Sequence, residues 1–144
     1  MPGCMATNNL PLPLPGGTGD TTFVPLYQRI VAPILQQYQP EMILVSAGFD
    51  AYFRDPLGGL KVTAQGHARA AAALIAAADR CAGGKICFVL EGGYSMEGLQ
   101  SCTQAVMREM EQGGRADEAR GVEDPLYYEI SSAAKRAYGE FWKW

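Results

Sequence analysis

Hydrophobic residues form two unbroken runs of about five, and each run stops at a segment that contains glycine. The first run covers residues 42–45, ends in Ser46, Ala47 and Gly48, and predicts a strand over 42–46; the second covers residues 86–90 and is followed by Glu91. Short apolar runs of this kind are typical of strands in a parallel sheet that is covered on both faces. The pattern therefore predicts two parallel strands.

Elsewhere the apolar residues recur at the three- and four-residue spacing of amphipathic helices. A polar residue among 20–22 is expected to cap a first helix that reaches about residue 39, with a kink or restart at Pro33. Three more helices are predicted: residues 63–82, residues 95 or 96 to 112, and a last one from a cap at Asp124 to about residue 144. Strands alternating with helices indicate a layered α/β fold.

The same pattern divides the chain into four segments. Residues 1–22 are expected to be extended because their alternating prolines remove backbone donors, 23–112 form the α/β unit, 113–123 a polar linker, and 124–144 an aromatic C-terminal helix. The aromatic side chains of the last segment are expected to pack back onto the sheet or to dock on another chain. Two or three strands are fewer than the four to six of an average sheet.

Composition narrows the possible functions. The 144 residues carry a formal net charge of −3 without a cluster of Lys and Arg, which argues against nucleic acid as a partner. No apolar stretch approaches the roughly 18 residues of a membrane span and the start does not resemble a signal peptide, so we expect no membrane partner and a cytoplasmic location. The four cysteines form no CxxC pair, and reduced thiols are favoured over a zinc cluster or disulfides.

His67 is the only histidine of the chain. This excludes any metal centre that needs two histidines from these residues. His67 itself lies at the start of a predicted helix, and we expect it to be partly exposed there.

The two predicted strands deliver unusual side chains to one edge of the sheet. Asp50 follows the first strand and Tyr94 follows the second, and ligands of open α/β sheets bind beyond the carboxyl ends of the strands. A carboxylate that holds a cation next to a hydroxyl that stabilises an oxyanion would suit metal-assisted acyl hydrolysis. From these residues alone, Asp50 as a loop cap and Tyr94 as a packed rim aromatic remain open. Gly92 and Gly93 either make room for a ligand or supply the positive φ of a turn.

Three stretches of the sequence, in this order along the chain, resemble the C-terminal half of the catalytic domain of the zinc-dependent histone deacetylase family. They are NLPLPLPGGTGD, QPEMILVSAGFDAYFRDPLGGLKVT and FVLEGGYSMEGL, and the similarity spans roughly residues 8–112. The class II members and the bacterial acetoin-utilisation and acetylpolyamine amidohydrolase-like members are the most similar. The resemblance implies part of the arginase/deacetylase fold, a three-layer α/β/α sandwich with a parallel sheet, and so explains why strands are few.

The resemblance also implies roles for individual residues. Asp50 matches a zinc-binding aspartate, and Tyr94 matches the tyrosine that polarises the scissile carbonyl. Leu57 matches a wall of the substrate tunnel, and Gly92 and Gly93 match glycines beside it. Two departures from the family pattern bear on substrate fit: Tyr52 stands in place of a frequent histidine, and Ser95 in place of a frequent asparagine.

The family's histidine pair and its Asp-x-His segment, which supplies the other two zinc ligands, lie upstream of the matched region. We therefore expect this chain to bind zinc poorly by itself, because a catalytic zinc normally has three protein ligands. Two functions remain open. The chain is either the C-terminal part of a deacetylase that removes acyl groups from lysine-like or polyamine amines, inactive until the missing half completes it, or a non-catalytic remnant that serves as an interaction module. Unpaired sheet edges make self-association a further expectation.

Overall fold

A computed structural model describes residues 9–114 and 123–144, so most of the expected linker lies outside the described residues. Its two strands, β1 (Ile43–Ala47) and β2 (Ile86–Leu90), pair in parallel from Ile43 opposite Ile86 to Ala47 opposite Leu90. The connection between them contains α3 (Ala64–Cys81), as a parallel pair requires. The predicted α/β class with a parallel sheet is confirmed.

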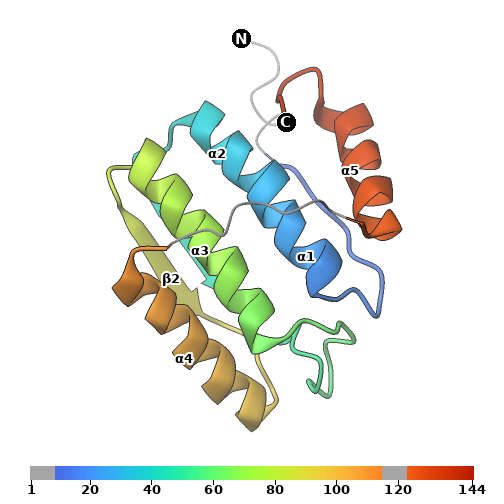
Figure 1. The fold of residues 1–144 in the computed structure, drawn as a ribbon, viewed down its shortest axis with the longest axis vertical. Coiled ribbons are helices and arrows are strands. Elements are labelled where there is room, and N and C mark those ends of the chain that lie inside the picture. Colours follow the sequence, from blue (N-terminus) through green and yellow to red (C-terminus); the bar gives the residue numbers. More distant parts are fainter. Residues whose placement is uncertain (1–8, 115–122) are drawn as a thin grey trace.

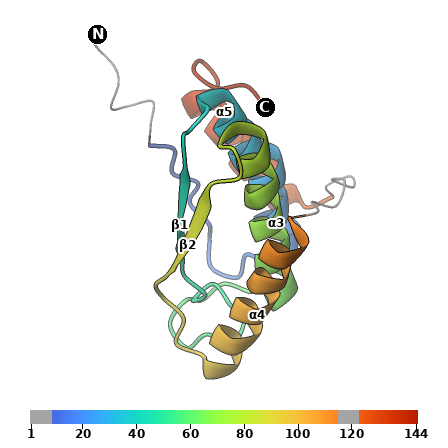
Figure 2. The same cartoon turned by 90° about the vertical axis from the view of Figure 1, so that its left-hand side faces the viewer.

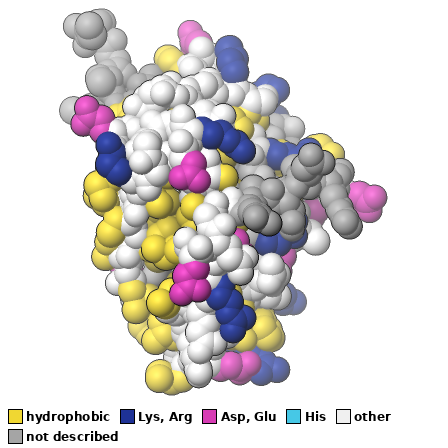
Figure 3. All heavy atoms as spheres, turned by 60° about the vertical axis from the view of Figure 1, so that its left-hand side comes forward, with side chains coloured by type: hydrophobic (Ala, Val, Ile, Leu, Met, Phe, Trp, Pro, Cys, Tyr) yellow, Lys and Arg dark blue, Asp and Glu magenta, His cyan; other side chains and the backbone are white. Residues whose placement is uncertain are grey.

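The helices lie on one face of the strands (Figures 1 and 2). Helices α3 and α4 (Met96–Gln112) pack against each other. On the other face of the strands, Leu44 is 70% exposed and Val89 is 48% exposed, so the expectation of a sheet covered on both faces is wrong for the part of the chain that is described. These residues provide a sheet and one helical layer of the sandwich. Hydrophobic side chains gather on the side of the molecule where the strands lie (Figure 3).

The first helical stretch consists of three pieces in direct succession. Helix α1 (Asp20–Leu26) leads into a π-helical turn, η1 (Tyr27–Val31), and then into α2 (Ala32–Tyr38). The π turn ends two residues before Pro33, where the expected restart occurs, because proline has no N–H for the regular helical ladder.

The expected cap among residues 20–22 is wrong, because the helix begins at Asp20 and Gly19 is its N-cap. Asp20 instead accepts hydrogen bonds from the backbone N–H of Thr63, at 2.8 Å, and from its hydroxyl, at 2.5 Å. Thr63 is the N-cap of α3 and accepts from the N–H of Gly66. The carboxylate therefore joins the starts of two helices.

The last helix, α5 (Pro125–Tyr138), is shorter than expected and packs on helices rather than on the sheet. Tyr127 and Ile130 are buried against Leu26 and Ile30. Asp124 caps α5 and also accepts from the hydroxyls of two neighbouring threonines at 2.6 Å, namely Thr21 and Thr22. Beyond Tyr138 the chain turns back, and the side chain of Gln37 exchanges two hydrogen bonds with the backbone of Lys143, which replaces further helical bonding.

His67 is buried, with 7% of its surface exposed, which corrects the expectation of a partly exposed residue. Its ring lies 5.7 Å from that of Phe23 and 5.2 Å from that of Phe49, centroid to centroid. Burial lowers the pKa of His67 to about 4, although the negative charges of Asp20 and Asp50 act in the opposite direction. The imidazole is therefore neutral at pH 7.

This burial predicts a loss of stability in mild acid. Since the pKa of His67 is lower in the folded than in the unfolded chain, its contribution is complete above pH 6.5 and is lost as the pH falls towards 4. A shift from 6.5 to about 4 corresponds to about 3 kcal/mol at most. Urea unfolding between pH 7 and pH 4 should therefore show a shallower pH dependence for His67→Leu than for the unsubstituted chain. Equal slopes between pH 6.5 and pH 5 would contradict the assignment.

None of the helices that the structure describes has the length and apolarity needed to cross a membrane.

Candidate functional site

The loops after β1 and β2 meet at the carboxyl edge of the two strands. The parallel register places Ala47 beside Leu90, so residues that follow them start from the same edge. The N–H of Phe49 then donates to the carbonyl oxygen of Gly92 at 2.8 Å. The predicted site residues Asp50 and Tyr94 therefore lie on two loops that are hydrogen-bonded to each other.

Glycines surround the half-buried Asp50. A Cβ atom on Gly92 would lie 2.8 Å from Oδ2 of Asp50, and one on Gly48 would lie 3.0 Å from Oδ1. A Cβ on Gly58 would overlap the carbonyl oxygen of Asp50. The Asp50 carboxylate thus occupies space that side chains at Gly48 and Gly92 would take.

Gly93 needs to be glycine for a different reason. Its φ of +134° is a conformation that side-chain-bearing residues rarely adopt. It lies between Gly92, next to Asp50, and Tyr94. The structure thus gives both glycines a steric role next to Asp50 and Tyr94.

Tyr94 and Leu57 are the most open of the predicted site residues. Tyr94 is 60% exposed and Leu57 is 72% exposed. Asp55 connects them: its Oδ2 accepts from the N–H of Tyr94 at 2.8 Å, and its Oδ1 accepts from the N–H groups of Leu57 and Gly58 at 2.8 and 2.9 Å.

These bonds affect the ionisation of Asp55. Partial burial raises the pKa of its carboxyl, but the backbone N–H groups of Tyr94, Leu57, Gly58 and Ser95 together outweigh burial and lower the pKa below its usual value. The carboxylate is therefore ionised at neutral pH and available as an acceptor.

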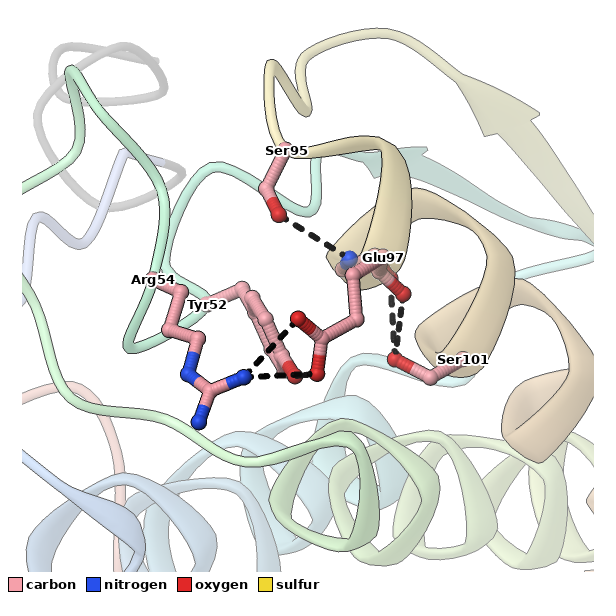
Figure 4. Close-up of polar contacts among 6 residues, drawn as sticks. Tyr52, Arg54, Ser95, Glu97 and Ser101 are labelled. Carbon is pink, nitrogen blue, oxygen red and sulfur yellow. Dashed lines mark hydrogen bonds and ion pairs between the residues drawn. The ribbon is translucent and has the colours of Figure 1, made fainter.

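A second contact joins the same two loops at the start of α4 (Figure 4). Arg54 Nη1 lies 2.9 Å from Oε2 of Glu97, and the hydroxyl of the buried Tyr52 donates to Oε1 at 3.2 Å. The Tyr52 ring also fills the space that a side chain on Gly98 would need. Tyr52, expected from the sequence to bear on substrate fit, is thus a buried packing residue beneath α4.

The described residues do not form a complete metal site. Among them, no group of three or more His, Cys, Asp or Glu side chains is placed to hold a metal ion. Asp50 offers one carboxylate at the loop edge, and His67 is buried between aromatic rings. A zinc centre with three protein ligands does not fit these residues alone.

Two features were missed from the sequence. The bond between Asp55 and Tyr94 joins residues 39 positions apart, and no local pattern indicates it, although Asp-Pro followed by Leu-Gly-Gly is a turn signal. The burial of His67 does have a signal, because residues three, four and seven positions later, Ala70, Ala71 and Leu74, are apolar and buried.

Comparison with known proteins identifies relatives of this arrangement. The family described as histone deacetylase domain matches residues 2–110. Histone deacetylase 10, chloroplastic, of Oryza sativa subsp. japonica is 42% identical over 99 residues, which are 69% of this chain and 22% of that protein. Histone deacetylase-like amidohydrolase of Pseudomonas aeruginosa is 38% identical over 118 residues, 82% of this chain and 30% of that protein.

Two solved structures share the fold. The structure of the histone deacetylase Clr3 superposes with a TM-score of 0.77 at 25% identity and covers 94% of this chain and 22% of its own. The crystal structure of the HDA15 HD domain gives a TM-score of 0.74 at 31% identity and covers 93% of this chain and 35% of its own. The chain thus spans between 22% and 35% of the length of these four relatives.

Proposed function

This chain belongs to the histone deacetylase family, and we propose that it supplies the C-terminal part of a zinc-dependent deacetylase that removes acetyl or other acyl groups from lysine-like or polyamine amines. The observation that carries the proposal is the joining of the Asp50 and Tyr94 loops at one edge of the parallel strands. A metal ligand, Asp50, and a hydrogen-bond donor to an oxyanion, Tyr94, at the same edge of the sheet suit the hydrolysis of an acyl group.

In this proposal each residue acts through its own chemistry. Asp50 offers carboxylate oxygens to the metal, and Gly48 and Gly92 leave room for that carboxylate. Zinc, when bound, would polarise the acyl carbonyl and activate a water molecule. Tyr94 donates its hydroxyl proton in a hydrogen bond to the carbonyl oxygen as negative charge develops there. Leu57, Gly92 and Gly93 line the path of the acyl chain.

The remaining parts of the site come from outside these 144 residues. A general base is needed to take a proton from water, and His67, neutral and enclosed by Phe23 and Phe49, is not available for that role. Two further metal ligands are needed as well. We therefore propose that the chain alone binds zinc weakly and has no turnover, and that it pairs with a segment that covers the open face of β1 and β2 or else self-associates. We also propose a cytoplasmic location.

The proposal is tested with a chimera. The segment of the Pseudomonas aeruginosa amidohydrolase that aligns with this chain is replaced by the corresponding residues of this chain, and zinc content and hydrolysis of an acetyl-lysine peptide and an acetylpolyamine are measured. We expect about one zinc per chimera, with turnover of at least one substrate, and neither for the isolated chain.

A folded chimera that binds no zinc and hydrolyses neither substrate would contradict the proposal and favour a non-catalytic interaction module. Stoichiometric zinc and turnover in the isolated chain would contradict the claim that the site is incomplete.

A further inference from the structure

A single carboxylate connects the two loops of the site at Tyr94 itself. Asp55 Oδ2 accepts from the N–H of Tyr94, while Oδ1 accepts from Leu57 and Gly58, all between 2.8 and 2.9 Å. The N–H of Ser95 also faces Asp55, and the remaining bonds between these loops involve Gly92, two residues before Tyr94, and Glu97, three residues after it. Asp55 is thus the contact that acts directly on Tyr94.

Ser95, after Tyr94, is fixed as the N-cap of α4, but the backbone on the Gly93 side of Tyr94 has little besides Asp55 to fix it. Gly93 precedes it, and glycine has more freedom of rotation than any other residue. The Tyr94 ring is 60% exposed, and its hydroxyl makes no hydrogen bond within the residues that the structure describes. The position of the hydroxyl relative to Asp50 therefore depends on where its backbone is held.

This contact requires a carboxylate and not merely a polar turn residue. Three N–H groups donate to its two oxygens at 2.8 to 2.9 Å and the N–H of Ser95 also faces the carboxylate, which when ionised acts only as an acceptor. An asparagine could keep its oxygen towards Leu57 and Gly58, but its NH2 group would then face the N–H of Tyr94, donor against donor. The bonds to Leu57 and Gly58 alone would make Asp55 an ordinary turn residue, and the bond to Tyr94 goes beyond that role.

The ion pair between Arg54 and Glu97 is a weaker candidate for the same task. Their side chains are 61% and 58% exposed, and exposed ion pairs contribute little. Glu97→Gln removes the charge while keeping an acceptor for Tyr52 and is therefore a matched control.

We propose that Asp55 is a positioning residue whose carboxylate holds the backbone of Tyr94 against the loop that carries Asp50 and Leu57, and so sets the place of the Tyr94 hydroxyl in the site. The structural half of this inference concerns the chain alone, and the consequence for catalysis rests on the proposed function.

The structural half is tested by amide hydrogen exchange, followed by NMR on the ¹⁵N-labelled chain. Asp55→Asn should speed exchange at Tyr94 about 10-fold or more, with Leu57 and Gly58 still protected, and Glu97→Gln should leave Tyr94 unchanged. In the unsubstituted chain the Tyr94 amide shift should titrate with the Asp55 carboxyl, whose pKa its backbone hydrogen bonds lower below the usual value; this measurement decides the question if the asparagine variant does not fold. Unchanged exchange in a folded Asp55→Asn chain, or a Tyr94 shift that does not follow this titration, would overturn the contact.

The catalytic half is tested in the chimera. Asp55→Asn should lower kcat about 10-fold or more while KM and zinc content stay the same, and Glu97→Gln should change none of the three. An unchanged kcat in an active chimera would refute the positioning role even where the exchange result holds. An inactive parent chimera would instead count against the proposed function, and the exchange experiment would still decide whether Asp55 holds Tyr94.

Discussion

Asp50→Ala is expected to remove zinc and turnover from the chimera. A catalytic zinc normally has three protein ligands, so the loss of the only one that we assign to this chain leaves two. Loss of an outer-shell partner of a zinc ligand already lowers metal affinity 10- to 100-fold, and loss of the ligand itself should exceed about 100-fold. Zinc per protein after dialysis should fall from about one to near zero, and acetyl-lysine hydrolysis should fall to background.

The matched control for this variant is Asp79→Ala. Asp79 is an exposed aspartate in α3 and should be dispensable for zinc. The alternative interpretation of Asp50, a loop acid that caps backbone donors, predicts a less stable loop with zinc retained. Full zinc occupancy in a folded Asp50→Ala chimera would therefore refute its role as a ligand.

The secondary structure was predictable because local signals agree along most of the chain. Helix α4 begins at Met96 behind a Ser95 cap and ends at Gln112 before Gly113, as its polar and glycine residues indicate. Strand β2 has the predicted bounds. The errors arise where distant residues intervene: Asp20 bonds to Thr63 instead of capping its own helix, and Gln37 holds the segment that was expected to continue α5.

The exposure of one face of β1 and β2 could not be predicted from the local sequence pattern. Leu44 and Val89 belong to unbroken apolar runs, which indicate burial, but burial of their face requires residues beyond those that the structure describes. The resemblance to half of a larger family fold already indicated a partial sheet.

The site was predictable in outline and not in its contacts. Two parallel strands bring Asp50 and Tyr94 to one edge by topology alone, so their common edge followed from the strand pattern. The means of holding them there did not, because Asp55 and Tyr52 reach across 39 and 45 positions in the sequence. Such contacts depend on how the loops fold over α4, for which no residue pattern exists.

Tyr94→Phe is expected to lower kcat of the chimera by about 10² to 10³, as does the loss of one oxyanion donor elsewhere, with zinc content unchanged. The hydroxyl is exposed and makes no hydrogen bond within the described residues, so its removal should leave the melting temperature unchanged. Steady-state kinetics, zinc content and thermal melting are compared with those of Tyr38→Phe, a control at another exposed tyrosine, which should retain full activity.

The variants Tyr94→Phe and Asp55→Asn separate the chemical role of the Tyr94 side chain from the position in which its backbone is held. Tyr94→Phe removes the donor and keeps the Asp55 bond, whereas Asp55→Asn keeps the donor and releases the backbone. If the donor acts only from the position that Asp55 sets, the double variant should be no slower than Tyr94→Phe alone, because there is no hydroxyl left to misplace. Multiplied losses in the double variant would mean that Asp55 acts on catalysis by a route other than Tyr94, and loss of zinc in Tyr94→Phe would refute the oxyanion role.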